Sequence, residues 1–351
     1  MKVLYVIEGI AAKGGLERIL IDKMNALVDS MDVTLLAVWR GQEEPAYRLD
    51  QRVQHISLDI PRPEGKIGFL FSLSRVLRRY NLTVKDINPD VVIHFRAIGA
   101  FLIGYGTHPC RTIFESHGVR YSNNHLWLYL RKERNVDTIV CLTEGDRQEY
   151  LVQKRCTDVR VIPNFTNVQP SSEPNIEAKN CVFIGRYCYE KNPERLLSLW
   201  GRIHDIHPDW TLDIYGEGWT EEALPSTLLH ADKHVNLHGN TNNVAQCLSQ
   251  ASILLLTSRT EGFGLTILEA MKCAVPVVSL DTPYGPSDLI DNAVTGYCTP
   301  YHDDDAFVSA VSTLMNDASL RLSMGRAANE RAKRFDKSVI MKQWLDLLTT
   351  N

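Results

Sequence analysis

Short runs of apolar, largely β-branched residues recur along the whole chain, and most are followed by a glycine loop and a helical spacing of apolar side chains. The first such unit has an apolar run at residues 2–8, a loop at 9–15, helical spacing over 16–28 and a second run at 33–38. Runs without alternating polar residues are typical of strands covered on both faces, as in parallel sheets. Strand, loop, helix and strand in this order form a βαβ unit, so we predict a doubly wound α/β fold.

The pattern also predicts the domain organisation. Residues 163–180 interrupt it with prolines, serines and asparagines, a composition typical of a linker. We expect one Rossmann-like domain over residues 1–165 and a second over 175–335, with a last helix at 338–351 that packs back on the first domain. Parallel sheets bind ligands at the carboxyl ends of their strands, which predicts a ligand site in a central cleft that both domains face.

Further elements are predicted by the same criteria. Strands are expected at residues 91–94, 111–114, 138–141, 159–162, 181–184, 211–215, 235–238, 253–256 and 275–279. Helices are expected at 192–206, 264–271, 303–314, 318–334 and 338–348. Three adjacent acids, Asp303, Asp304 and Asp305, precede one of these helices, and we interpret them as a helix cap rather than a metal site.

Composition restricts the classes of function. No apolar run approaches the ~18 residues that cross a bilayer, and no secretory leader is recognisable, so we expect a cytoplasmic protein. The eight cysteines contain no Cys-x-x-Cys pair, which argues against a zinc knuckle or a disulfide framework.

Charge is divided unevenly along the chain. The net charge of −4 combines 23 Lys and Arg against 19 Asp and Glu over residues 1–168 with 15 against 23 over 169–351. A basic first half favours an anionic partner. Since no nucleic-acid-binding motif accompanies this charge, we expect a membrane surface or a phosphate-bearing acceptor rather than nucleic acid.

The segment 257–271, TSRTEGFGLTILEAM, contains the most chemical information. Gly262 and Gly264 form a turn between a predicted buried strand and the N-terminus of a helix, an arrangement whose free N–H groups bind phosphate. Glu261 and Glu269 are eight residues apart, so that one carboxylate can reach a hexose and the other a ribose. Taken alone, they are equally well explained as a helix N-terminal acid and a solvated helix glutamate.

The context of these two glutamates resembles a known family. EGFGLTILEAM, followed by VPVV at residues 275–278, is similar to the signature of retaining family-4 glycosyltransferases of GT-B fold, and GPSDLI at 285–290 resembles the next segment of many bacterial polysaccharide members. The resemblance covers nearly the whole chain and is strongest over residues 181–300. It implies transfer of a hexose from a UDP-sugar to a saccharide or lipid-linked saccharide acceptor in cell-surface polysaccharide synthesis, without a metal or other cofactor.

The resemblance also implies roles for individual residues. Glu269 would bind the ribose hydroxyls of the nucleotide, and Glu261 would hold hydroxyls of the transferred sugar. Arg186 and Lys191 would bind the diphosphate, and a guanidinium and an ammonium five residues apart after a strand suit such a leaving group independently of the resemblance. The remaining donor-binding residues would be Gly14, Gly15, Gly262, Phe263, Gly264 and Leu265.

One histidine matches a family residue that holds the donor sugar. It is His117, in ESHG directly after the predicted strand at 111–114. A lone histidine is more often structural, and His94 and Arg96 are weaker candidates. Glu17 is interpreted as helix surface and Asn164 as a structural residue of the hinge. The predicted catalytic set is His117, Glu261, Arg186 and Lys191.

Three questions stay open at this point. Basic amphipathic stretches at 66–79 and 126–134 favour contact with an anionic membrane, although packed helices with solvated basic faces explain them slightly better. A UDP-sugar epimerase shares the two-domain fold, but it should lack the two glutamates with this glycine turn. A catalytically silent subunit that binds a nucleotide would not need Arg186, Lys191, Glu261 and Glu269 together.

Overall fold

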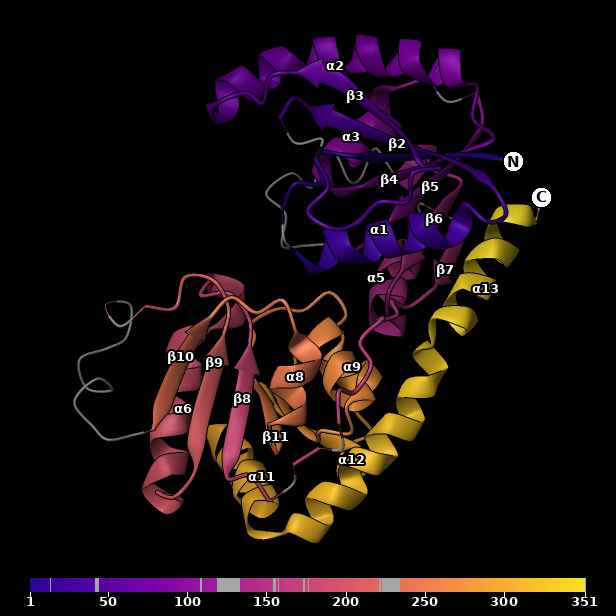
Figure 1. The fold of residues 1–351 in the computed structure, drawn as a ribbon. Coiled ribbons are helices and arrows are strands. Elements are labelled where there is room, and N and C mark those ends of the chain that lie inside the picture. Colours follow the sequence, from indigo (N-terminus) through magenta and orange to yellow (C-terminus); the bar gives the residue numbers. More distant parts are fainter. Residues whose placement is uncertain are drawn as a thin grey trace. The chain divides into compact units, whose positions relative to one another are not determined.

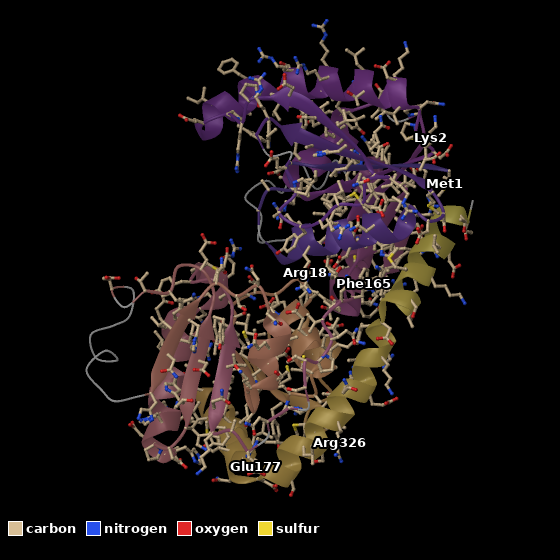
Figure 2. The ribbon with its side chains drawn as sticks, viewed as in Figure 1. Met1, Lys2, Arg18, Phe165, Glu177 and Arg326 are labelled. Atoms are coloured by element: carbon tan, nitrogen blue, oxygen red, sulfur yellow. The ribbon has the colours of Figure 1, made fainter. Side chains whose placement is uncertain are left out.

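A computed structural model describes residues 1–350 apart from 13, 42–43, 108, 119–132, 154–155, 157, 173, 176, 221 and 223–233. The chain divides into two compact units (Figure 1). Unit 1 comprises Met1–Asn164 together with Ser338–Asn351, and unit 2 comprises Phe165–Lys337. Phe165, with which unit 2 begins, is labelled in Figure 2.

Unit 1 contains a seven-stranded sheet in the order β3-β2-β1-β4-β5-β6-β7, and every pair of neighbours is parallel. Its strands are β1 Lys2–Ile7, β2 Asp32–Trp39, β3 Gln54–Ile60, β4 Val91–Phe95, β5 Arg111–Glu115, β6 Thr138–Cys141 and β7 Val159–Val161. Its helices are α1 Gly15–Leu27, α2 Gly65–Ile87, α3 Arg96–Tyr105, α5 Glu144–Gln153 and α13 Lys337–Thr349.

Unit 2 contains a six-stranded parallel sheet in the order β10-β9-β8-β11-β12-β13. Its strands are β8 Asn180–Ile184, β9 Thr211–Tyr215, β10 Val235–Gly239, β11 Ile253–Leu256, β12 Val277–Leu280 and β13 Gly296–Thr299. Its helices are α6 Pro193–Ile206, α8 Val244–Ser249, α9 Leu265–Lys272, α10 Pro286–Leu289, α11 Asp304–Asn316 and α12 Ala318–Ala332, with short 3₁₀ turns at Tyr189–Lys191 and Lys333–Phe335. The predicted pair of doubly wound parallel sheets is therefore confirmed.

Each unit has its own hydrophobic core between helices and sheet. In unit 2, Trp200 and Phe183 are fully buried where α6 and α11 cover the sheet. The predicted cap of α11 is also confirmed, because the Asp303 carboxylate accepts a hydrogen bond from the backbone N–H of Ala306 at 2.8 Å.

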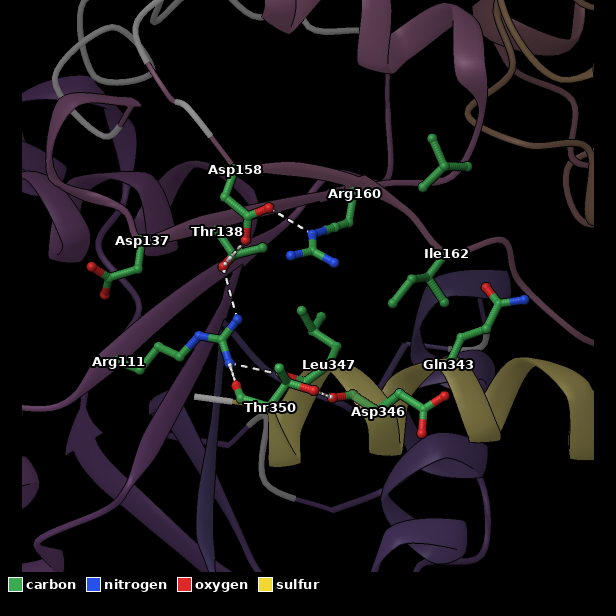
Figure 3. A pocket seen from close by; sticks show the side chains of 11 residues that line it. Arg111, Asp137, Thr138, Asp158, Arg160, Ile162, Gln343, Asp346, Leu347 and Thr350 are labelled. Atoms are coloured by element: carbon green, nitrogen blue, oxygen red, sulfur yellow. Dashed lines mark hydrogen bonds and ion pairs between the residues drawn. The ribbon is translucent and has the colours of Figure 1, made fainter.

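The C-terminal part of the last helix, α13, packs at the amino end of β5. Arg111, the first residue of β5, donates to the carbonyl oxygens of Leu347 at 2.8 Å and Thr350 at 3.0 Å. A cavity of about 480 Å³ lies beside this contact (Figure 3), and several of its polar side chains pair with one another, as in the Asp158–Arg160 ion pair at 2.6 Å. This cavity lies at the opposite end of the sheet from the carboxyl edge, where ligands of such folds bind.

Candidate functional site

The glycine turn of unit 2 lies between β11 and α9. Gly264 is the N-cap of α9 with φ +91°, a backbone conformation that favours glycine. A Cβ atom at Gly264 would lie 3.0 Å from Cδ1 of Ile267, so the site is also tight. The first N–H groups of a helix have no intrahelical acceptor and carry the positive end of the helix dipole. The turn is therefore suited to an anion, as the sequence predicts.

The GPSDLI segment packs directly against this turn. Gly285 precedes α10 with φ +95°, and a Cβ atom there would lie 2.6 Å from the carbonyl oxygen of Phe263. Its backbone N–H also donates to the Asp288 carboxylate at 3.2 Å. A larger residue would displace the turn, so this segment fixes the backbone of the predicted phosphate site.

The structure brings two of the predicted site residues into contact. The Nζ atom of Lys191 lies 2.6 Å from Oε1 of Glu261, and the Ser258 hydroxyl donates to the same oxygen at 2.6 Å. Both charged side chains are largely buried, with 23% of Lys191 and 10% of Glu261 exposed. The contact is possible because β8 and β11 are parallel neighbours, so the loops that follow them lie at the same edge of the sheet.

A second contact joins the same two loops and was not predicted. The backbone N–H of Arg259 donates to the carbonyl oxygen of Glu190 at 2.7 Å. The Arg259 guanidinium lies 4.3 Å above the centre of the Tyr189 ring. Together with the Lys191–Glu261 pair, these contacts fix the loop that carries the predicted diphosphate-binding cations.

Glu269 and Arg186 occupy different surroundings. Glu269 is buried in α9, and its Oε1 accepts a hydrogen bond from the Thr166 hydroxyl at 3.5 Å. Arg186 is exposed and forms no ion pair with any residue that the structure describes. The pKa of Glu190 is lowered chiefly by a hydrogen bond from its own backbone and further by the charges of Arg186 and Lys191. Both cations therefore act on one small region of this loop.

In unit 1, Gly14 and Gly15 begin α1, and the interpretation of Glu17 as helix surface is wrong. Glu17 is buried and pairs with Arg96 at 2.9 Å. A Cβ atom on Gly14 would lie 2.4 Å from Oε2 of Glu17, so the missing side chain makes room for the carboxylate to turn back over the helix N-terminus. The helix dipole and Arg96 stabilise the carboxylate there.

His117 lies beyond the carboxyl end of β5 in a buried cluster. Its Nε2 is 2.8 Å from Oε1 of Glu115, and the same oxygen accepts a hydrogen bond from Nζ of Lys23. Burial alone would raise the pKa of Glu115, but its interactions with Lys23 and His117, which include a hydrogen bond from each, lower it to about 2. Burial lowers the pKa of His117. His94, by contrast, is bonded to the Tyr80 hydroxyl at 2.9 Å inside the core.

Sequence reasoning missed several of these partners. Glu115 directly follows the predicted strand, so its place at the edge of the sheet was predictable. The burial of Lys23 was not, because a lysine within a helix gives no signal of burial.

The segment 126–132 of the second basic stretch lies outside the described residues. Within the described ranges, no three His, Cys, Asp or Glu side chains are grouped to hold a metal ion, and no helix has the length and hydropathy to span a membrane.

Two all-parallel sheets of this kind, each with its predicted site residues at the carboxyl edge, define the GT-B class of glycosyltransferase folds. HepE from Anabaena, solved in complex with UDP-glucose, has the same fold, with a TM-score of 0.78, 17% identity and 99% of each chain covered. Residues 165–331 match the family model Glycosyl transferases group 1, so this part of the chain is a glycosyltransferase group 1 domain. The predicted resemblance is thereby confirmed, whereas membership of family 4 stays a prediction.

Two bacterial proteins are similar over almost their whole length. An uncharacterized glycosyltransferase of Haemophilus influenzae is 26% identical over 357 residues, which is 99% of each chain. A Campylobacter jejuni α-1,4-N-acetyl-D-galactosaminyltransferase, whose named substrate is a saccharide on diphospho-undecaprenol, is 25% identical over 358 residues, covering 99% of this chain and 98% of that protein.

Proposed function

We propose that this protein is a retaining family-4 glycosyltransferase that transfers a hexose from a UDP-sugar to a saccharide or lipid-linked saccharide in cell-surface polysaccharide synthesis. The observation that carries this proposal is the Lys191–Glu261 pair beside the glycine turn that begins α9. It combines a cation for the departing diphosphate with a carboxylate for sugar hydroxyls. The UDP-glucose complex of HepE and the lipid-linked substrate of the Campylobacter relative support the choice of donor and acceptor.

In this proposal, positive charge fixed before the reaction stabilises the leaving group. Arg186, Lys191 and the first N–H groups of α9 would take up the charge that develops on the diphosphate as the glycosidic bond breaks. Glu261, already oriented by Ser258, would accept hydrogen bonds from hydroxyls of the hexose. Because these groups neutralise the diphosphate, we propose that no metal is required.

A donor screen tests the proposal. Isothermal titration of the purified protein with UDP, GDP and ADP, and with their common sugar conjugates, should show preferential binding of UDP and one UDP-hexose. Transfer of that radiolabelled hexose to an undecaprenyl-diphosphate-linked N-acetylglucosamine probe should continue in EDTA. Binding of no nucleotide by folded protein would contradict the assigned site. Binding without transfer to any saccharide would favour a silent subunit, and an epimerised sugar released without acceptor would favour an epimerase.

We further propose that α2 brings unit 1 to an anionic membrane. Three apolar side chains of its first half are strongly exposed: Ile67 by 72%, Leu70 by 62% and Phe71 by 79%. The exposed Arg75 and Arg78 follow at helical spacing on the same face. The opposite face contributes Val76, Tyr80 and Val84 to the core. An exposed apolar row continued by arginines is the pattern of a helix that lies in a lipid interface.

The position of this row fits a lipid-linked acceptor. α2 runs along β3 and begins just beyond the carboxyl end of that strand (Figure 1). The exposed row at Ile67, Leu70 and Phe71 therefore lies at the same edge of the sheet as His117, which follows β5. A membrane on this face would present its saccharides to the edge of unit 1 that carries the predicted sugar-binding histidine.

Liposome flotation tests the membrane proposal. The protein should float with vesicles of phosphatidylglycerol and phosphatidylcholine. Flotation should be weaker in high salt, because salt screens exposed charges. It should be absent with pure phosphatidylcholine, which has no net charge. Replacing Leu70 and Phe71 by serine should abolish flotation. The matched control Val152→Ser, which removes a 75% exposed apolar side chain from α5, should not. Failure of the wild type to float with any anionic vesicle would refute the proposal.

A further inference from the structure

Glu115 links two other charged or titratable side chains inside unit 1. It is the last residue of β5 and is 1% exposed. Its Oε1 accepts a hydrogen bond from Nζ of Lys23, on α1, and lies 2.8 Å from Nε2 of His117. Its other oxygen, Oε2, has no hydrogen-bond partner among the described residues. The position of the His117 ring is therefore set by the same carboxylate oxygen that holds the buried lysine.

This geometry determines which nitrogen of His117 carries the proton. An ionised carboxylate only accepts hydrogen bonds, so Nε2 must donate to Glu115. Glu115 stays ionised because Lys23 and His117 outweigh the effect of burial on its pKa. Burial and the charges of Lys23 and Arg96 lower the pKa of His117, whereas Glu115 raises it. The pKa is lowered on balance, and a lowered pKa favours the neutral ring. In that form Nδ1 has a free lone pair and accepts a hydrogen bond.

Aromatic rings hold the lysine in place. Nζ of Lys23 lies 4.4 Å from the ring centre of Trp344 and 5.7 Å from that of Phe95. Phe95 also lies 5.7 Å from the His117 ring, and Trp344, on α13, is 1% exposed. A desolvated ammonium over an aromatic face is stabilised by the ring quadrupole. Lys23 is thus held between the Glu115 carboxylate and the rings of Trp344 and Phe95. Because the lysine is fixed, the carboxylate that pairs with it is fixed as well.

We infer that Glu115 is a positioning residue for His117: with Lys23 and Trp344 behind it, Glu115 fixes the ring as the Nε2–H tautomer, so that Nδ1 accepts a hydrogen bond from a hydroxyl of the donor sugar. The sugar contact rests on the proposed function, whereas the tautomer does not. The last helix of the chain thereby takes part, through one lysine, in orienting a predicted catalytic side chain.

The tautomer is tested without any substrate. Long-range ¹H–¹⁵N correlation of the histidine rings, with His117 identified by loss of its signals in His117→Ala, should show protonated Nε2 and unprotonated Nδ1. Glu115→Gln leaves the buried Lys23 unpaired and risks unfolding. The combined variant Lys23→Met with Glu115→Gln removes both charges, and the glutamine can donate as well as accept. It should therefore show a mixture of tautomers, and an unchanged Nε2–H ring would overturn the inference.

A kinetic cycle tests the sugar contact. In the combined Lys23→Met, Glu115→Gln variant, kcat/KM for transfer should fall about 3- to 10-fold, the range expected for one lost hydrogen bond. In a His117→Ala background the same two substitutions should change kcat/KM no further, because their effect passes through the ring. Equal losses in both backgrounds would overturn the positioning role. An inactive wild type that binds no nucleotide would instead contradict the proposed function and leave the tautomer result standing.

Discussion

Lys191→Met is expected to lower kcat for hexose transfer by about 100- to 1000-fold, the usual effect of losing one fixed charge at a developing anion. The side chain is held 2.6 Å from Glu261 at the edge where the diphosphate is proposed to leave, and methionine keeps its length without its charge. Transfer kinetics with the donor identified by titration measure the effect. Lys179→Met is the matched control, since Lys179 pairs with Asp209 on the exposed surface of the same unit.

The outcome separates chemistry from structure. Glu261 keeps its hydrogen bond from Ser258 in the Lys191→Met variant, so the turn should remain folded and UDP should still bind. A kcat within threefold of the wild type would mean that Lys191 does not act on the leaving group. An equal loss in the Lys179→Met control would point to a general effect of charge instead.

Glu269→Ala is expected to raise the Kd for UDP by about 5- to 150-fold, which corresponds to roughly 1–3 kcal/mol for ribose hydroxyls left without their buried acceptor. Glu269 is buried in α9, where its Oε1 accepts a hydrogen bond from the Thr166 hydroxyl. Titration with UDP measures the change. Glu330→Ala, on the exposed face of α12, is the control.

A ligand lacking the hydroxyls makes this test specific. The wild type should bind 2′,3′-dideoxy-UDP more weakly than UDP, and the Glu269→Ala variant should bind the two equally. If the variant loses the same factor for both ligands, Glu269 acts through its contact with Thr166 on the fold, and the ribose role is wrong.

Most strands were predictable because each is a buried apolar run. β11, ILLL, has the predicted bounds, and β1 and β6 differ from prediction by at most one residue. The strands missed are those without such a run. β3, QHISLDI, alternates polar and apolar residues at the edge of its sheet, and β13, GYCT, has only its two ends buried. Both are edge strands, where a single neighbouring strand leaves more side chains exposed, so a continuous apolar run is not required there.

The site was predictable where function constrains the backbone. The glycine turn is recognisable because the positive φ of Gly264 and the close approach of its backbone to Ile267 require glycine. Lys191 follows a strand at a recognisable distance. The Glu115–Lys23 pair was not predictable, because burial of a charge depends on contacts between α1, β5 and α13 that lie far apart in sequence. Glu17 was misread for the same reason, since its partner Arg96 belongs to a distant helix.

Unit 1 is interrupted in sequence by the whole of unit 2, and this has a consequence for biosynthesis. Its last helix, α13, begins at Lys337, where unit 2 ends, so the ribosome makes every residue of unit 2 before it makes Trp344. Because domains fold as units as they emerge, unit 2 can complete its core first. Until then Lys23 lacks the tryptophan ring that covers it. The synthesis of unit 1 begins before that of unit 2, but unit 1 can be completed only after α13 has been made.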